Sequence, residues 1–369
     1  MATIFRWKVT LIGSLFIIQS MLILPKRKKD ARMRKWGIAA LLLLLIGGCS
    51  KTELPPITGI VSDDPIVYYQ ASVSPTTSVF TGKTVYGDTY QAVGVMFENT
   101  VAARPQSGIS LADVVYEISV DGWQISRFLG IFSTTLPSKI GPVRSARFPF
   151  VRVMREWDIA FTHFGAGQTG LGNVIPLIRS SDFPVRFDGH TGLNDDYFSR
   201  DPERNAPHNA YWNGQEALEM IPQMKVDKHF LFNKNVVYSG DDVSQLNLRY
   251  ASNNRVTYKY LPDEQRYARF INDEPMMDAY NDSQVMVTNI IIQHAPHHAV
   301  ERVRYIIVEF EGSGKAEFYI GGKVIKGSWK KPVEGKPTTF YDNNGEEIKL
   351  LPGNTWIQVV HPDIPITTS

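Results

Sequence analysis

Apolar runs of strand length dominate residues 80–165 of this chain. Four such runs occur, at residues 92–97, 114–120, 125–132 and 158–164, and each places apolar side chains on both faces of a strand. Strands with this pattern are buried on both sides, so other elements must cover the sheet. Covering helices are expected at 142–156, where apolar residues recur every three or four positions, and at about 213–221. The pattern predicts an α/β or α+β domain over residues 79–240.

After about residue 246 the pattern changes to short strands separated by turns. Turn sequences such as Gly321-Gly322 and Asn343-Asn344-Gly345 fall roughly every ten residues. Short strands at this spacing are typical of an antiparallel sheet or a small sandwich. Residues 241–369 are therefore predicted to form a smaller, mainly antiparallel β domain, with strands at 255–260, 265–271, 285–293, 303–310, 316–320, 323–329, 338–341 and 355–360.

A basic and apolar segment precedes these domains. Met33-Arg34-Lys35 is followed by the apolar run Trp36–Ile46 and by Gly47-Gly48-Cys49. A short basic start, about 7–15 apolar residues and small residues at the end are typical of a secretory signal. Small residues directly before a cysteine form a lipobox, where bacteria attach a diacylglycerol. Residues 1–48 are thus predicted to be a signal region and Cys49 a lipidation site that anchors an extracytoplasmic protein to the membrane.

The first apolar run, Val9–Leu24, does not fit a signal sequence, because polar and small residues interrupt it. One interpretation is that translation starts at Met33 and that the preceding residues are an extension. The alternative is a helical hairpin whose basic loop faces the cytoplasm. Residues 49–78 are rich in Pro, Ser, Thr and Asp and are expected to form a flexible tether between the anchor and the first domain.

Composition changes this picture once the signal region is removed. The full chain has 39 Lys and Arg against 37 Asp and Glu, and residues 1–48 hold nine of the basic and one of the acidic residues. The remaining 321 residues carry 30 basic and 36 acidic side chains, a net charge of −6. Such a protein has no general attraction for nucleic acid, so no nucleic-acid partner is expected. Since Cys49 is the only cysteine, packed cores must supply the stability without disulfides.

The segment Lys139–Arg147 places two arginines at the start of an expected helix. Gly141-Pro142 is typical of a helix start, and Arg144 and Arg147 then fall in the first two turns, where the helix dipole disfavours cations. Negative charge is expected to offset them. Either carboxylates of the same protein or an anion bound at the helix start would do so.

Several strings resemble those of the YerB-like family of bacterial lipoproteins, whose N- and C-terminal domains have no assigned function. In the first domain the matching strings are Glu98-Asn99, Ala103–Gly108, Ala112–Glu117, Ser126-Arg127-Phe128, Gly141–Arg147 and Ala206-Pro207-His208-Asn209. In the second domain they are Gly327–Lys330, Thr339–Asp342 and Pro352–Val360. The resemblance implies a two-domain envelope lipoprotein. The sequence departs from it at Asp121-Gly122-Trp123, where the family usually has Glu-Gly-Gly.

Arginines recur in these strings and make the first set of candidate site residues. Arg104, Arg127, Arg144 and Arg147, together with Asn209, are predicted to bind an anionic ligand, because the planar guanidinium holds carboxylate or phosphate through paired hydrogen bonds. The alternative is a purely structural network in which the same arginines pair with Glu98, Glu117 and Asp121. The sequence does not decide between the two.

Histidines and carboxylates make a second set, for catalysis. His163 ends a predicted strand and His208 lies in a matching string, so either could act as a general base with Glu98 or Glu117. Asp188 and His190 could join them as metal ligands, but no metal-binding spacing is present, and no metal or cofactor is expected. The string Gly165–Gly170 matches G-x-G-x-x-G, yet glycine and proline interrupt the residues that follow, which indicates a loop rather than a nucleotide site.

The sequence as a whole predicts a membrane-anchored lipoprotein with a non-catalytic role in the bacterial cell envelope. Its expected partners are the membrane, through Cys49, and an anionic envelope ligand or an envelope protein. One alternative is a hydrolase or transferase that acts on a cell-wall substrate. Another is a protein-interaction role with a purely structural arginine–carboxylate network.

Overall fold

The computed structural model describes residues 7–12, 15–20, 75–300 and 305–369, and the chain divides into units at 1–63 and 64–369. In the first unit, β1 (Trp7–Ile12) and β2 (Leu15–Ser20) pair as an antiparallel hairpin. Most of the predicted signal region, the Met33 start, Cys49 and the tether before residue 75 lie outside the described residues. Within them, no helix is long and apolar enough to cross a membrane.

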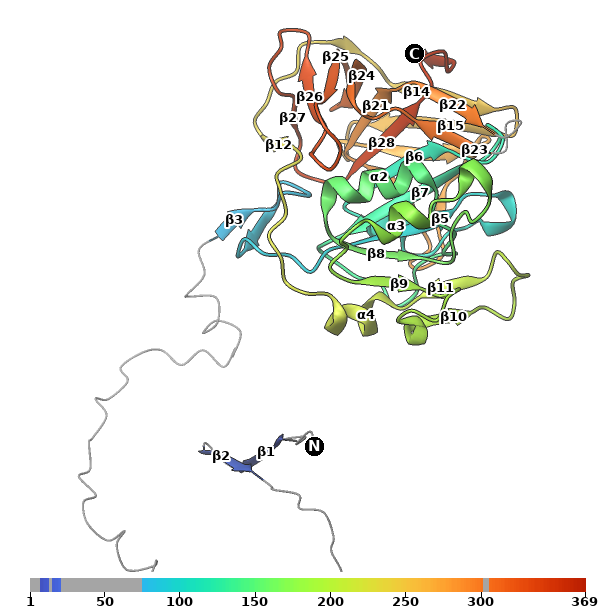
Figure 1. The fold of residues 1–369 in the computed structure, drawn as a ribbon. Helices are drawn as coiled ribbons and strands as arrows, with labels where there is room; N and C mark the ends of the chain where they lie inside the picture. The colour runs from blue at the N-terminus through green and yellow to red at the C-terminus, as the bar shows by residue number, and fades with distance from the viewer. Residues whose placement is uncertain (1–6, 13–14, 21–74, 301–304) are drawn as a thin grey trace, which may run out of the picture. The chain divides into compact units, whose positions relative to one another are not determined.

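An eleven-stranded mixed sheet forms the centre of the second unit (Figure 1). The strand order is β13-β25-β24-β21-β28-β6-β7-β5-β8-β9, and β26 pairs with β25. In chain order these strands are β5 (Val93–Glu98), β6 (Val114–Ser119), β7 (Ser126–Phe132), β8 (Ala160–His163), β9 (Arg186–Asp188), β13 (Asp241–Asp242), β21 (Asn289–His294), β24 (Gly312–Ile320), β25 (Lys323–Lys331), β26 (Thr339–Asp342) and β28 (Thr355–Val360). The sheet is continuous across the boundary predicted near residue 240, because β28 lies parallel to both β6 and β21.

Both faces of this sheet are buried, as the continuous apolar runs predict. Successive side chains alternate between two cores: Val115 and Trp356 face one core, and Tyr116 and Ile357 face the other. Helices α2 (Phe148–Trp157) and α3 (Ile175–Arg179) cover one face (Figure 1). A six-stranded sheet covers the other, formed by β14 (Gln245–Ala251), β15 (Asn254–Leu261), β16 (Arg266–Ile271), β17 (Glu274–Pro275), β20 (Met286–Val287) and β29 (Ile366–Thr368).

Short elements complete the described residues. They are β3 (Pro75–Thr77), β4 (Thr84–Tyr86), β10 (Phe198–Arg200), β11 (Ala210–Trp212), α4 (Gly214–Ala217), β12 (Leu231–Phe232), β18 (Met277–Asp278), β19 (Ser283–Gln284), β22 (His297–Val300), β23 (Tyr305–Val308) and β27 (Lys349–Leu350), with 3-10 turns at Val101–Ala103, Ile109–Leu111, Gly170–Gly172, Asp195–Tyr197 and Leu218–Met220. The predicted helix near 213–221 is confirmed as α4 and the 3-10 turn after it. Asn213 caps it by accepting a hydrogen bond from the Glu216 amide.

The helix predicted at 142–156 is wrong in its first half. Residues up to Arg147 are extended, the Gly141-Pro142 bond is cis, and α2 begins only at Phe148. The reason is long-range hydrogen bonding that local periodicity does not reveal. The Pro142 carbonyl accepts from the Glu98 amide, and the Arg144 amide donates to the Met96 carbonyl, so this stretch pairs with β5 instead of coiling. The two arginines therefore precede the helix rather than lie within its first two turns.

The segment His294–His298 forms a tight connection between β21 and β22. His294 ends β21 and His297 begins β22, and both side chains are buried, whereas His298 is exposed. The turn itself is only Ala295-Pro296, and the Ala295 carbonyl accepts a hydrogen bond from the His297 ring at 2.8 Å. Pro296 in the turn and His298 after it are exposed, and His297 is the one buried residue of β22.

A fully buried ion pair joins the two halves of the chain. Arg269 of β16 donates to Glu117 of β6 at 2.5 Å, and neither side chain has measurable solvent exposure. Ser126 donates to the other Glu117 oxygen at 2.6 Å, and Tyr258 accepts from Arg269 at 3.1 Å. The guanidinium also lies over the ring of Trp356 at 4.6 Å. These contacts compensate both charges in an interior where an unpaired ion is very costly.

Replacing Glu117 by Gln is expected to lower the free energy of unfolding by about 3–5 kcal/mol, because it leaves the Arg269 charge buried without a counter-ion. Urea denaturation at neutral pH measures the loss. Asp273→Asn is the matched control, since Asp273 pairs with Arg255 at 2.7 Å on the surface, where such pairs contribute about 0–1 kcal/mol.

The double variant Glu117→Leu with Arg269→Met should recover most of this loss, because it removes both charges and keeps the volume apolar. An unchanged denaturation midpoint for Glu117→Gln would contradict the role given to this pair.

Candidate functional site

Asp121 lies in the turn between β6 and β7 and holds two of the predicted arginines. Its carboxylate accepts from both Nε and a terminal nitrogen of Arg147, at 3.1 Å each, and from Arg127 at 3.0 Å. Burial alone would raise the pKa of Asp121, but the charges of Arg127 and Arg147 outweigh it and hold the pKa below its usual value. The remaining terminal nitrogens donate to the carbonyls of Ser145 and Ala146. Arg127 and Arg147 are therefore committed to internal contacts.

Trp123 follows in the same turn, at the position where the family resemblance implies glycine. Its backbone has a φ of +69°, a region that favours glycine, and Gly122 beside it has a φ of +79°. The indole ring packs against His297 and His361, with ring centroids 6.0 and 5.6 Å away. These contacts accommodate the bulky residue, and the carboxylate of Asp121 still reaches its arginines.

Glu98, at the end of β5, organises a second cluster. One oxygen of this buried carboxylate lies 2.9 Å from Nδ1 of His208 and 3.3 Å from Nε of Arg144, and the other accepts from Thr100 at 3.0 Å. The Arg144 contact is electrostatic, because its Nε lacks hydrogen-bond geometry. No described residue accepts a hydrogen bond from the terminal nitrogens of Arg144, and its side chain is about one quarter exposed, at 25%. Its guanidinium is thus partly available to a ligand.

A cavity of about 490 Å³ opens beside these clusters. Arg144, Arg147 and Arg200 line it, and no Asp or Glu occurs among the described residues of its lining. The rest of the lining is Ser145, Phe164, Gly165, Ala166, Gly167, Gln168, Thr169, His190, Pro207 and Tyr305. We call it the arginine cavity. The Gly165–Gly170 string forms a loop after β8, as predicted, and contributes much of this wall.

Arg200, at the end of β10, is the most exposed arginine of the arginine cavity. It donates to Asn209 Oδ1 at 2.7 Å, and its guanidinium lies 4.8 Å from the centre of the Phe164 ring. No carboxylate of the described residues lies within ion-pair distance of Arg200. Asn209 is itself buried, donates to the carbonyls of Asp201 and Arg204, and so positions Arg200 rather than lining the cavity.

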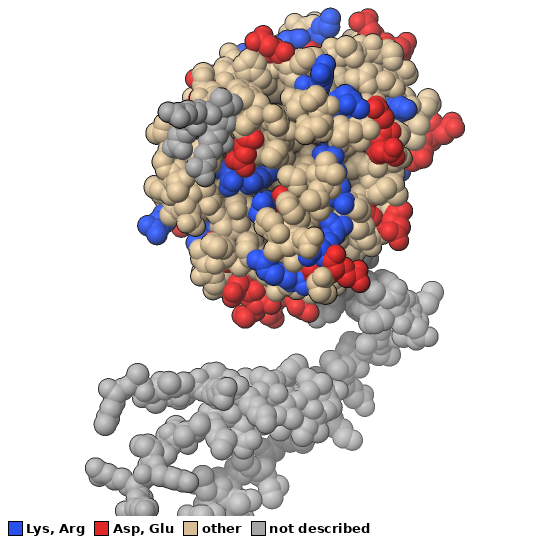
Figure 2. Space-filling view, turned by 90° about the vertical axis from the view of Figure 1, so that its right-hand side faces the viewer, with Lys and Arg blue, Asp and Glu red and all other residues tan. Residues whose placement is uncertain are grey.

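Positive charge exceeds negative charge in this region. Three arginines line the cavity and Arg127 lies behind them, whereas two carboxylates, Glu98 and Asp121, pair with this group. A third carboxylate, Asp188, accepts from the amides of the lining residues Gly165 and His190, so four arginines against three carboxylates leave an excess of one positive charge among the described residues. Figure 2 shows a face on which Lys and Arg side chains gather around the centre, while most Asp and Glu side chains lie towards the rim. The arrangement favours an anion within the cavity.

Arg104 lies apart from the arginine cavity. Its Nε donates to the Asn99 side chain at 3.1 Å and a terminal nitrogen to the Asn99 carbonyl at 2.8 Å. Burial and the nearby charge of Arg269 lower the pKa of Arg104 to about 10. Glu117, which also accepts from Asn99, is sealed in the ion pair with Arg269 and has no path to solvent. Arg104 and Glu117 thus belong to the buried network between the two halves.

His163 is buried next to the glycine loop. Its Nδ1 lies 2.8 Å from the Gly165 carbonyl, and Asp188 is 3.7 Å away. Burial lowers the pKa of His163 to about 4, so the ring is neutral at neutral pH. Asp188 accepts from the amides of Gly165 and His190 and so holds the loop. No group of three or more His, Cys, Asp or Glu side chains placed to hold a metal ion occurs among the described residues.

Sequence reasoning did not find Arg200, His190, Phe164 or Tyr305 as cavity residues. They come from separate loops and strands, and none has a spacing that links it to the Gly141–Arg147 string. Of these residues, Arg200 alone lies close in sequence to a family-like motif. It is nine residues before Asn209, which ends the motif Ala206–Asn209. Arg200 is positioned next to Asn209 by the pairing of β10 with β11, which places Arg200 opposite Ala210.

Comparison with known proteins agrees with the two-part organisation. The model "Protein of unknown function (DUF3048) N-terminal domain" matches residues 80–227, and the corresponding C-terminal domain model matches residues 246–357. "Putative lipoprotein YerB" of Bacillus subtilis is 30% identical over 280 residues, which cover 74% of this chain and 81% of that protein. The crystal structure of YerB protein from Bacillus subtilis superposes with a TM-score of 0.68 at 28% identity and covers 79% of this chain and 99% of that chain.

Proposed function

The chain belongs to the YerB-like DUF3048 family, and from this premise we propose that it is a membrane-anchored extracytoplasmic lipoprotein that binds an anionic ligand in the arginine cavity. The lipobox that ends in Cys49 and the name of the Bacillus subtilis relative support the anchor. The role is non-catalytic, and the ligand is a carboxylate- or phosphate-bearing component of the cell envelope, presented by a molecule or by a partner protein.

One observation carries the ligand proposal: the described lining of the arginine cavity has three arginines and no carboxylate. Three carboxylates behind it, Glu98, Asp121 and Asp188, leave one of the four arginine charges unbalanced among the described residues. An anion that bound there would complete the charge balance and receive paired hydrogen bonds from guanidinium groups. In this proposal residues 79–240 form an α/β or α+β domain that presents the site.

The arginines divide between structure and binding. Arg127 and Arg147 are fixed by Asp121 and supply positive potential, whereas Arg144 and Arg200 keep donor groups that no described residue accepts. Arg144 and Arg200 are therefore the residues assigned to contact the ligand. The sequence left two alternatives open, a structural network of arginines and carboxylates and a pocket for an anion. The proposal includes both in one arrangement.

Replacing Arg144 or Arg200 by Gln is expected to raise the Kd for inorganic pyrophosphate by about tenfold or more, because a hydrogen bond to a charged group contributes about 1.5–3 kcal/mol. Isothermal titration calorimetry at low ionic strength measures the change. Arg255→Gln is the control, since it removes an exposed arginine that pairs with Asp273 outside the cavity, and its Kd should stay unchanged.

The structural alternative predicts the opposite pattern. If Arg144→Gln lowers the free energy of unfolding by several kcal/mol while pyrophosphate binds equally well, the arginines serve the fold alone. Circular dichroism and urea denaturation of each variant separate the two cases.

Cys49→Ser is expected to abolish the incorporation of labelled palmitate and to move the protein from the membrane fraction to the soluble fraction, because the lipid is the proposed anchor. Fractionation of cells that express each form measures this, with Ser50→Ala as the control. Retention of the Cys49→Ser protein in the membrane at the wild-type level would show that another segment provides the anchor.

A second function is favoured by one distance, the 2.9 Å between Glu98 Oε2 and His208 Nδ1. A buried carboxylate that accepts from Nδ1 leaves Nε2 as a base, as in hydrolases with a carboxylate–histidine pair. The imidazole is about one quarter exposed, at 25%, and Pro207 before it lines the arginine cavity. The corresponding activity is a hydrolase or transferase on a cell-wall substrate.

This second function predicts that the purified protein releases soluble fragments from isolated cell walls, detected by mass spectrometry, and that His208→Gln and Glu98→Gln release none. His298→Gln is the control, because His298 pairs with Glu309 on the surface. If the unmodified protein releases no fragments, the hydrolase or transferase function is wrong and only the binding function is left.

A further inference from the structure

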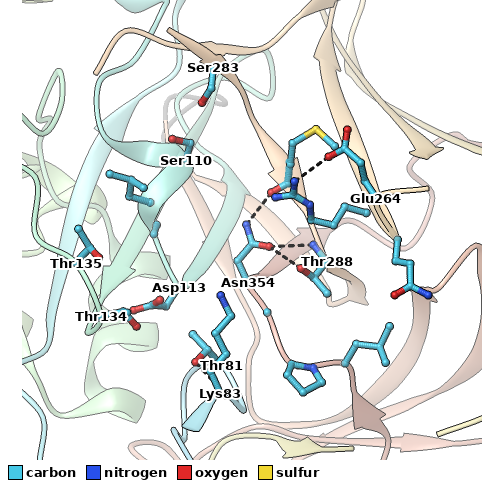
Figure 3. A pocket seen from close by; sticks show the side chains of 18 of the residues that line it. Thr81, Lys83, Ser110, Asp113, Thr134, Thr135, Glu264, Ser283, Thr288 and Asn354 are labelled. Carbon is cyan, nitrogen blue, oxygen red and sulfur yellow. Dashed lines mark hydrogen bonds and ion pairs between the residues drawn. The ribbon is translucent and has the colours of Figure 1, made fainter. Parts of the chain in front are cut away.

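A second cavity, of about 830 Å³, lies between segments from both halves of the chain and shares no lining residue with the arginine cavity. We call it the interdomain cleft (Figure 3). The N-terminal half contributes Ser110–Asp113 and Thr134-Thr135. The C-terminal half contributes the turn between β15 and β16 and the turn Pro352-Gly353-Asn354 before β28. The cleft is therefore a product of the joined sheet, and neither half forms it alone.

The Pro352–Asn354 turn gives the cleft a rigid floor. Asn354 Oδ1 accepts from the Thr288 amide at 2.9 Å and from the Thr288 hydroxyl at 3.1 Å, and its side-chain amide donates to the Met286 carbonyl at 2.8 Å. The Gly353 amide donates to the Thr81 carbonyl. A Cβ at Gly353 would lie 2.2 Å from Thr288 Oγ1, so glycine is required for this close approach. The floor is preorganised, which lowers the cost of binding.

Three charged side chains of the cleft lining, Lys83, Lys234 and Asp113, have no ion-pair partner among the described residues. All three hydrogen bonds that Asp113 accepts, from the amide and hydroxyl of Ser133 and the amide of Thr134, end on Oδ2, so Oδ1 is left for another donor. The ammonium of Lys83 points into the space between Asp113 and Asn354 (Figure 3). Burial of Asp113 raises the pKa of its carboxyl, which a bound cation or N–H donor would counteract.

The other lining side chains identify the kind of ligand. Hydroxyl and amide groups predominate, and the described lining contains no aromatic ring. A sugar ring would find no flat apolar surface to stack on, and an apolar ligand would leave many polar groups unpaired. Hydroxyl and amide side chains instead match the N–H and C=O groups of a peptide. The volume lies within the range of about 300–1,000 Å³ that is typical of small-ligand sites.

We propose that the interdomain cleft binds a short peptide with a free carboxyl terminus. The terminal carboxylate pairs with the Lys83 ammonium, in the manner of other sites that recognise a peptide end by its charge. Asp113 Oδ1 accepts from an N–H of the same peptide, and the hydroxyl and amide groups of the walls pair with its backbone. This site is independent of the arginine cavity, and its test does not depend on the proposed function.

Tetra-alanine with a free carboxyl terminus and the same peptide with a C-terminal amide are the two probes. Isothermal titration calorimetry on the full-length protein should give a Kd at least about tenfold lower for the free carboxylate, since one charged contact is lost in the amide. Lys83→Gln should bring the two Kd values together. Lys326→Gln, on the exposed side of β25, is the matched control and should keep the difference.

Arg200→Gln tests whether the peptide carboxylate binds in the other cavity, and loss of the difference in this variant would overturn the proposal. Asp113→Asn should weaken both peptides equally, and its unfolding curve shows whether the variant remains folded. Equal Kd values for the two probes, no saturable binding at millimolar peptide, or persistence of the difference in Lys83→Gln would each overturn the proposal. Displacement of the peptide by an N-acetylglucosamine tetramer would also overturn it, since it would make the cleft a glycan site.

Discussion

The parallel pairing of β28 with β6 is the constraint on which the rest of the structure depends. It places a strand from the end of the chain beside one from its first third, in register from Thr355 opposite Val114 to Val359 opposite Ile118. Through this pairing two sets of strands become one sheet, and the second sheet is held against its face. Parallel strands from distant segments close a very long loop, so their formation requires strong tertiary contacts. The buried Glu117–Arg269 pair and the aromatic core around Trp356 supply such contacts.

Both cavities inherit their positions from this arrangement. Glu117 and Asp121 lie four residues apart, on β6 and just after it, so one strand carries the ion pair to the second sheet and the carboxylate that fixes two arginines. At the other end of the same strand, Asp113 begins the wall of the interdomain cleft and its carbonyl accepts from the Thr355 amide. A change in the β6–β28 register would therefore displace elements of both sites.

Local pattern was enough to predict the central strands β5, β6, β7 and β8, because burial on both faces leaves continuous apolar runs, but it did not reveal β9 or β14. It failed where the hydrogen bonds are long-range: residues 142–147 have helical periodicity and a proline start, yet their backbone pairs with β5 and with Ala210. The same limit applied to the site. Arg144 and Arg147 were found in one string, but the partner of Glu117 lies 152 residues away, and Arg200 reaches the cavity only through strand pairing. The sequence showed which charged side chains needed a counter-charge. It could not show which residues provide it.

The commitment of Arg127 and Arg147 to Asp121 strengthens the case for an anion site. A ligand that had to order four flexible arginines would lose much of its binding energy to side-chain entropy and desolvation. Here two of them are already fixed by hydrogen bonds and charge, and they contribute potential to the cavity at no further cost on binding. Their shared carboxylate does not cancel that potential, because one negative charge faces two positive ones. Arg144, restrained through Glu98, and Arg200, restrained through Asn209, then need little reorganisation to receive an anion. In the proposed function the internal network and the binding site are therefore two parts of one arrangement, in which the network lowers the cost of binding.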